Sequence, residues 1–401
     1  MDEAVEIVLS RHPTLAVDDA VIAARSAARR SAFGAFLPSV DARGSWTRYL
    51  NEVGAVSEGT ELASSRPPTE LTAGVSIGLL IFDGFARSSQ YNARNADLES
   101  ARLQREADEV TLAFDTRRVF LSILGSRAHA DAIRSAIATL GRQRARLAER
   151  IQLGVLPGVD LTLLDADVAR MRHSLVLTEN EVSANLATLS ALLDMPVGTS
   201  IDVTSRGVRL GMDSGERGPM FDTLEALSAR SGGTSSRVAM LTTSVLAAEE
   251  GAAAARAGYY PQVGASLGYG LYSSGPISQT SGTLGLNLTY NLFDGFRTDE
   301  AVAQAEAGVR RARAELRAGT RQVAAESEAV VLRLQAAERA LISADAALAA
   351  AQIRRRSVTD RIEAGAGRTD DPLTATQALS DARVASIEAG TQWWISFYDV
   401  V

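Results

Sequence analysis

The sequence of 401 residues contains no cysteine, and arginine accounts for all 41 of its basic residues, because lysine is absent. Without cysteine, this sequence can form no disulfide, no thiolate metal site and no lipidated N-terminal cysteine. The exclusive use of arginine is typical of a GC-rich genome. Aromatic residues make up only 5% of the chain, whereas alanine is abundant. This balance favours long, closely packed helices over an aromatic-rich globular core.

Long apolar runs are also missing. No run of about 18 apolar residues occurs, so the sequence predicts no transmembrane helix. The opening MDEAVEIVLSRHPTL is acidic and lacks the apolar stretch of a signal peptide. Strands of a membrane β-barrel would escape a hydropathy search, because their side chains alternate. The net charge of −7 gives no electrostatic case for nucleic-acid binding.

Catalytic and metal-binding patterns are not recognisable. The three histidines, His12, His129 and His173, are scattered, and no HExxH motif or Ser/His/Asp set appears. The segment GASLGYG (264–270) looks superficially like a phosphate loop, but its alternation predicts a strand. The glycosylation motif NLT (287–289) also falls inside a predicted strand. We therefore predict no enzyme activity, no cofactor and no bound metal.

One short motif occurs twice. IFDGF at 81–85 returns as LFDGF at 292–296, 211 residues later, and AFLPSVDARGSW at 35–46 resembles GYYPQVGASLGY at 258–269, 223 residues later. The two offsets indicate an internal duplication with a loop that differs in length by 12 residues. We predict a domain division of first repeat, connector and second repeat, at 1–195, 196–220 and 221–401.

Each repeat reads as helix, strand, loop, strand, long helix, turn and helix. The predicted helices are 2–34, 84–151, 159–194, 221–257, 295–363 and 371–398. At about 1.5 Å per residue, the two longest would each extend about 100 Å. A packing seam is predicted along the first long helix, interrupted by Arg144, from Ile133, Ile137, Leu140, Leu147 and Ile151.

Four segments alternate apolar with small or polar residues, as strands do. They are 39–50, 71–81, 263–271 and 284–292. Such alternation fits one face in lipid or a core and one face in water. We expect Leu286 and Leu288 to face outward into a bilayer.

FDGF stands where a strand becomes a helix. Asp83 and Asp294 can accept hydrogen bonds from the first helical turn, and Gly84 and Gly295 permit the change of backbone direction. A membrane-interface belt could be formed by the aromatic residues of the motifs, Phe82, Phe85, Phe293 and Phe296. Alternatively, these residues are only helix caps and packing residues.

These features resemble the TolC-like outer-membrane efflux proteins, also called outer membrane factors. The resemblance covers nearly the whole chain. It rests on DEAVEIVLSRHPTL, FLPSV, YYPQV, both FDGF strings, GVLPGVDLTLLDADVAR and GAGRTDDPLTATQALSDAR. The sequence departs from relatives in lacking a signal peptide and in ending at WWISFYDVV, where relatives usually continue.

The resemblance implies a mainly α fold with a small β part and an internal two-fold sequence repeat. Long antiparallel helices would form a trimeric α-helical barrel, capped by a 12-stranded outer-membrane β-barrel with four strands per chain. It also implies a homotrimer in outer-membrane lipid, projecting into the periplasm, with a periplasmic adaptor (membrane fusion protein) and an inner-membrane pump. The expected function is export of small molecules or proteins, with no nucleic-acid partner.

Geometry independently supports a trimer. Four strands cannot close a barrel, and barrels of about eight strands are filled by side chains. Three chains would supply twelve strands and a lumen, whereas two would supply eight. The alternative hypothesis is a soluble long-helix coiled-coil scaffold or adaptor, which has no need for a band of outward-facing leucines.

Two glycine-rich turns, 154–160 and 365–372, join the predicted antiparallel helices and would lie together at a periplasmic entrance. They carry acidic residues, Asp160, Asp370 and Asp371. The similar families place aspartates at this entrance; Asp371 matches best by motif, and Thr374 stands where relatives often have a second aspartate. The alternative is that these aspartates only cap the returning helices.

Overall fold

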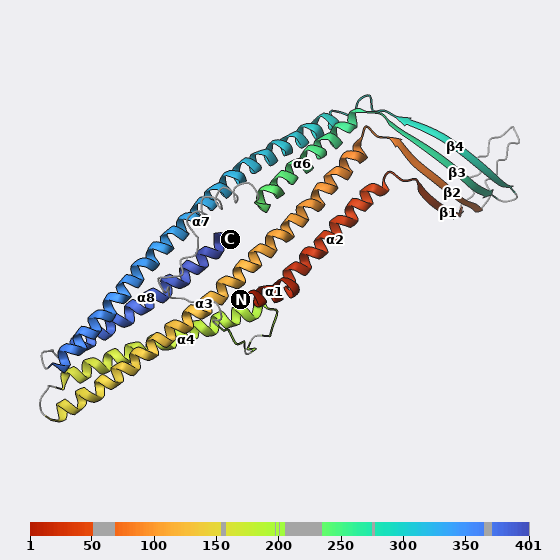
Figure 1. The fold of residues 1–401 in the computed structure, drawn as a ribbon. Coiled ribbons are helices and arrows are strands. Elements are labelled where there is room, and N and C mark those ends of the chain that lie inside the picture. The colour runs from red at the N-terminus through yellow and green to blue at the C-terminus, as the bar shows by residue number, and fades with distance from the viewer. Residues whose placement is uncertain are drawn as a thin grey trace, which may run out of the picture. The chain divides into compact units, whose positions relative to one another are not determined.

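The computed structural model describes residues 1–50, 69–153, 158–196, 198–199, 201–204, 235–274, 277–364 and 371–400 (Figure 1). The helices are α1 (Asp2–Arg11), α2 (Pro13–Gly34), α3 (Ala86–Gln152), α4 (Val159–Leu192), α6 (Ser236–Arg256), α7 (Arg297–Glu363) and α8 (Asp371–Val400), with a short 3₁₀ turn η1 (Ala257–Tyr259). The strands are β1 (Ser39–Arg48), β2 (Thr69–Phe82), β3 (Gln262–Ser274) and β4 (Ile277–Thr289). The fold is therefore mainly helical with one small sheet, as predicted.

The chain divides into two compact units. The helical unit contains Met1–Asp19, Gln104–Arg237 and Thr320–Val401. The sheet unit contains Ala20–Leu103 and Val238–Gly319. Each unit draws residues from both halves of the sequence. The predicted division at 1–195, 196–220 and 221–401 concerns duplication along the sequence, and it stays a prediction.

The sheet has the order β1-β2-β3-β4, and every neighbouring pair is antiparallel (Figure 1). β2 and β3 approach each other closely where Gly74 lies opposite Gly270. A Cβ atom on Gly74 would come within 3.1 Å of the Tyr269 carbonyl oxygen, so a larger residue would crowd the backbone. Near its end β2 carries a bulge between Leu80 and Phe82.

The first helix is shorter than predicted. We expected one helix over 2–34, but α1 ends at Arg11 and α2 begins at Pro13. His12 between them is extended, with φ −62° and ψ 129°. Proline disfavours the helical conformation of the residue before it, which explains the break.

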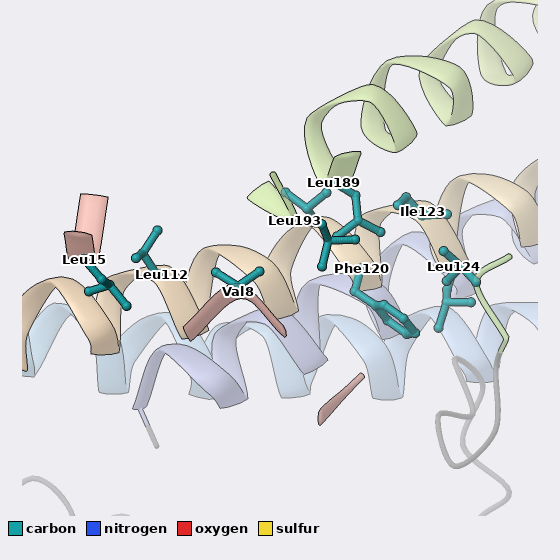
Figure 2. Packing of buried hydrophobic residues seen from close by; sticks show 10 residues of the cluster. Val8, Leu15, Leu112, Phe120, Ile123, Leu124, Leu189 and Leu193 are labelled. Carbon is teal, nitrogen blue, oxygen red and sulfur yellow. The ribbon is translucent and has the colours of Figure 1, made fainter. Parts of the chain in front are cut away.

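The helical unit is held together by apolar side chains from several helices. The largest cluster joins α1, α2, α3 and the end of α4; Figure 2 shows Leu189 and Leu193 gathered with Val8 beside α3. A second cluster packs Trp393 of α8 on Leu334, Ala337 and Leu341 of α7. A third cluster consists of Leu140, Leu164 and Val168, with Leu147, Met171 and Leu373 against it. Part of the predicted seam, Leu140 and Leu147, therefore packs as expected.

Other element boundaries also differ from expectation. The alternation predicted a strand over 284–292, but β4 ends at Thr289 and begins earlier, at Ile277. The strand predicted over 39–50 ends at Arg48. The helix predicted over 221–257 is described from Ser236 as α6, and residues 221–234 lie outside the described residues.

Candidate functional site

The two faces of the sheet differ in chemistry. Directly opposite residues of antiparallel strands point to the same face, so the registers assign each side chain to a face. The first face, here called the apolar face, includes the rows Val40–Ile77–Leu267–Leu284 and Ala42–Val75–Tyr269–Gly282. Further along, Leu79–Ala265–Leu286 continue it. The alternating apolar residues predicted within 71–79 and 263–271 fall on this face, whereas Ile81, also predicted to alternate, lies in the bulge between Leu80 and Phe82.

The opposite, polar face carries small and hydrophilic side chains. Its rows include Asp41–Ser76–Gly268–Thr283, Arg43–Gly74–Gly270–Ser281 and Ser45–Thr72–Tyr272–Gln279. Within these rows Ser45 Oγ and Thr72 Oγ1 lie 2.7 Å apart. A shallow hollow lies in the sheet around Arg43, Gly74 and Gly270. A sheet with one apolar and one hydrophilic face suits a boundary between lipid and water.

Both FDGF motifs form the same backbone corner. In the first, Gly84 and Phe85 have φ of 65° and 70°; in the second, Gly295 and Phe296 have φ of 70° and 65°. Glycine adopts this left-handed region freely, whereas a phenylalanine there is uncommon. The chain thus turns by two consecutive left-handed residues at each strand-to-helix junction.

The aspartates of the motifs bind the first helical turns. Asp83 Oδ2 accepts a hydrogen bond from the Arg87 backbone N–H at 3.0 Å, and Asp294 Oδ2 accepts one from the Thr298 N–H at 3.0 Å. The motif phenylalanines also form matching edge-to-face pairs. The ring centroids of Phe82 and Phe85 are 5.6 Å apart, and those of Phe293 and Phe296 are 5.5 Å apart. Their placement in a membrane interface stays a prediction.

The first corner has an additional tie. The Arg87 guanidinium contacts Asp83 Oδ2 at 2.9 Å and donates to the carbonyl oxygens of Leu80 at 2.7 Å and Ala35 at 3.1 Å. It also lies 5.1 Å from the Phe36 ring centroid. The Arg87 side chain, which is 11% exposed, therefore links the end of β2, the segment before β1 and the start of α3.

The predicted entrance residues are only partly described. Asp160 is the second residue of α4 and Asp371 is the first residue of α8, whereas Asp370 lies outside the described residues. Both described aspartates occupy helix N-termini, where a carboxylate is favourable in either role considered above. Their part in an entrance stays a prediction.

Sequence reasoning missed a polar layer close to these N-termini. Gln377 Nε2 of α8 donates to Asp167 Oδ2 of α4 at 2.8 Å, and Gln143 Nε2 of α3 donates to Thr376 Oγ1 of α8 at 3.0 Å. Asp167 is only 8% exposed, and it also pairs with Arg170 of its own helix. The layer therefore connects α8 with both α3 and α4. Acidic residues on long helices are usually solvated, so no sequence signal distinguished Asp167.

Arg144, which interrupts the predicted seam, forms a bidentate pair with α4. Its Nε lies 2.5 Å from Asp165 Oδ1, and its Nη2 lies 3.1 Å from Asp165 Oδ2. The hydrogen bond from Arg144 holds the pKa of the Asp165 carboxyl below its usual value. Both side chains are about half exposed, so the pair orients the helices more than it stabilises them.

The described helices are not suited to span a bilayer, because none is both long and apolar enough. Comparison with known proteins identifies the class. The sequence profile of the outer membrane efflux proteins matches residues 4–194 and 234–398, so the chain belongs to this family. It is an outer-membrane export channel protein. No curated protein matches the sequence.

Solved structures share the fold at low sequence identity. The outer membrane protein VceC from Vibrio cholerae is similar with a TM-score of 0.83 and 17% identity, covering 100% of this chain and 94% of that chain. The CmeC outer membrane channel of Campylobacter jejuni gives 0.83 and 14%, with 100% and 84% covered. The Neisseria gonorrhoeae MtrE outer membrane channel, in an open state, gives 0.79 and 13%, with 99% and 87% covered.

Proposed function

We propose that three copies of this chain assemble into one export duct, with a twelve-stranded β-barrel in the outer membrane and a barrel of helices in the periplasm. The observation that carries this proposal is the four-stranded sheet with one apolar face, one polar face and two edges, β1 and β4, that have no strand partner among the described residues. Four strands cannot close a barrel alone, and open edges invite pairing with another chain.

The composition of the two faces sets the orientation. The apolar face meets lipid, and the polar face lines the lumen, because side chains of a membrane barrel alternate in this way. An eight-stranded barrel is filled by its side chains, whereas a larger barrel encloses a channel. Small residues such as Gly74 and Gly270 on the polar face leave the lumen wide.

The partners follow from the class of protein. A periplasmic adaptor and an inner-membrane pump deliver cargo to the duct, and the channel itself conducts without catalysing a reaction. This proposal is supported by membership in the efflux family and by the shared fold with outer membrane channels.

The periplasmic end carries the selectivity. Across three chains, nine carboxylates would surround one opening, contributed by Asp160, Asp370 and Asp371. A ring of carboxylates in a constriction favours cations and binds divalent ions. The resting entrance is narrow, and adaptor docking opens it by moving the helix pairs apart. Such a movement would have to break the bonds from Gln377 to Asp167 and from Gln143 to Thr376.

Single-channel recordings in planar bilayers test the entrance. Asp370→Asn/Asp371→Asn should reduce both the cation selectivity and the block by divalent ions. Glu388→Gln, which removes one carboxylate from an exposed position further along α8, should leave both unchanged. Unchanged selectivity and block in the double variant would show that these aspartates only cap α8. A purified wild-type protein that forms only monomers or dimers would reject the duct itself.

A further inference from the structure

The two open edges of the sheet raise the question of how one copy would meet the next. We propose that β4 of one copy pairs antiparallel with β1 of the neighbouring copy in a single register, in which Asn287 lies opposite Ser45. This inference rests on the proposed trimer and adds the residues that close it. Its basis is the pairing already present inside one chain.

The two hairpins have the same register. In the first hairpin Val40 pairs with Ile77. Val263 lies 223 positions after Val40 and Leu288 lies 211 positions after Ile77, and these two residues pair in the second hairpin. Likewise Ala42 with Val75 corresponds to Ala265 with Leu286. By these offsets β1 corresponds to β3 and β2 corresponds to β4, with the same residue pairing in both hairpins.

The pairing of β2 with β3 then serves as the template for the contact between copies. In that pairing the last strand of the first repeat meets the first strand of the second. Ser76 lies opposite Gly268. Advancing Ser76 by 211 positions gives Asn287, and moving Gly268 back by 223 gives Ser45. The neighbouring pair Val75–Tyr269 gives Leu286 opposite Trp46 in the same way.

The resulting register preserves both faces of the sheet. Leu286 and Trp46 both belong to the apolar face, and Asn287 and Ser45 both belong to the polar face. A slip of one residue would place every apolar side chain of one strand beside a polar one of the next. This agreement follows from the shared register of the two hairpins, because the offsets carry residues of the apolar face onto residues of the apolar face.

The early end of β4 has the same explanation. The pairing of β2 with β1 stops at Gly78, opposite Ser39. Beyond it, Leu79, Leu80 and Phe82 pair with β3 alone. The corresponding residues of the second repeat are 290–293, where the alternation predicted a strand but β4 has already ended. In the assembled protein, β1 of the next copy would pair with residues 290–293, as β3 pairs with the end of β2. The end of β4 therefore lacks its pairing strand in a single chain.

The two glycine corners differ in a matching way. A Cβ on Gly84 would meet the Ala257 carbonyl oxygen and the Tyr260 Cβ, both at 2.8 Å, whereas nothing lies within 4 Å of a Cβ on Gly295. Moving Tyr260 back by 223 positions gives Leu37. Leu37 of the next copy would therefore lie beside Gly295, as Tyr260 lies beside Gly84. Leu37 is 56% exposed in the single chain, and Phe293 is 77% exposed. Both surfaces would be covered by the proposed contact.

Cysteine cross-linking tests the register cleanly, because the chain has no cysteine of its own. The full chain carrying Ser45→Cys/Asn287→Cys is assembled in membranes and oxidised with copper phenanthroline. Directly opposite residues of antiparallel strands lie about 4.5–5.5 Å apart between Cα atoms, within disulfide range. Each copy would link to both neighbours, so most of the protein should run as a covalent trimer on a non-reducing denaturing gel.

Two offset pairs bracket the register. Arg43→Cys/Asn287→Cys and Thr47→Cys/Asn287→Cys place the second thiol two residues to either side on the same face. Diagonal neighbours lie about 7–8 Å apart, so these pairs should link at least fivefold less. A second in-register pair on the apolar face, Trp46→Cys/Leu286→Cys, covers the case in which the first variant does not assemble.

The outcomes separate this inference from the proposed function. Preferential linking of each in-register pair that assembles supports the register. A trimer by mass whose strongest link is an offset pair, or which links through none of the four pairs, overturns the register and leaves the duct standing. A wild-type protein that forms no trimer rejects the proposed assembly, and the register with it.

Discussion

Placing a charge on the apolar face tests how the sheet meets the membrane. Leu286 is the central one of three leucines that β4 presents on this face, between Leu284 and Leu288, and it is 72% exposed in the single chain. An arginine on the lipid face of a barrel costs about 2–4 kcal/mol at the membrane midplane. The cost falls toward the interfaces, so three symmetric copies would lose up to about 6–12 kcal/mol per trimer, enough to reduce assembly strongly.

The matched control is Asn287→Arg, one residue further along the same strand. Asn287 pairs with Gly264 on the polar face, where the added arginine would reach the aqueous lumen. Refolding into lipid vesicles, followed by gel mobility with and without heating, measures the folded trimer directly. We expect Leu286→Arg to abolish most of it and Asn287→Arg to retain it. Equal yields from the two variants would refute the assignment of the faces.

Two further predictions concern the helical unit. Asp167→Ala should lower the stability of the helical unit by about 1–3 kcal/mol, because it leaves the Gln377 amide without its acceptor. Asp167→Asn keeps an acceptor and serves as the control. A similar loss of melting temperature in both variants, measured by circular dichroism, would disprove this reason. The pKa of Asp18 is raised above 3.8 by burial and then by the nearby Asp108 carboxylate, against the attraction of Arg105. The contribution of protonated Asp18 to the stability of the fold is therefore fully present below pH 3.8, and it is lost as the pH rises through the raised pKa. Asp18→Asn should therefore melt at a higher temperature than the wild type at pH 7, with the gain shrinking toward pH 3.8, whereas Asp19→Asn, which removes a partner of Arg105, should gain nothing. An Asp18→Asn gain that does not change with pH would contradict the electrostatic cause.

The strand faces could be predicted from the sequence because alternation is a local property. Ala73, Val75 and Ile77 repeat every second residue, and the period alone places them on one face whatever their partners are. The corner geometry was also accessible, since Gly84 and Gly295 stand at the one place in each repeat where the periodicity changes from strand to helix.

Features that depend on distant contacts were less accessible. The polar layer joins Asp167 of α4 to Gln377 of α8, and no local pattern reveals that these helices meet there. The strand predicted to reach Leu292 was wrong for the single chain, because alternation records what a strand is suited for, whereas its observed end depends on an available partner. The break at Pro13 was a local signal that the helical periodicity on both sides obscured.

The most direct test of the account is the mass of the purified, detergent-solubilised protein, measured by light scattering with the detergent contribution subtracted. A four-stranded sheet with two open edges requires other copies to close a barrel, so the account predicts a mass three times that of the chain. A stable monomer or dimer as the sole species would contradict it.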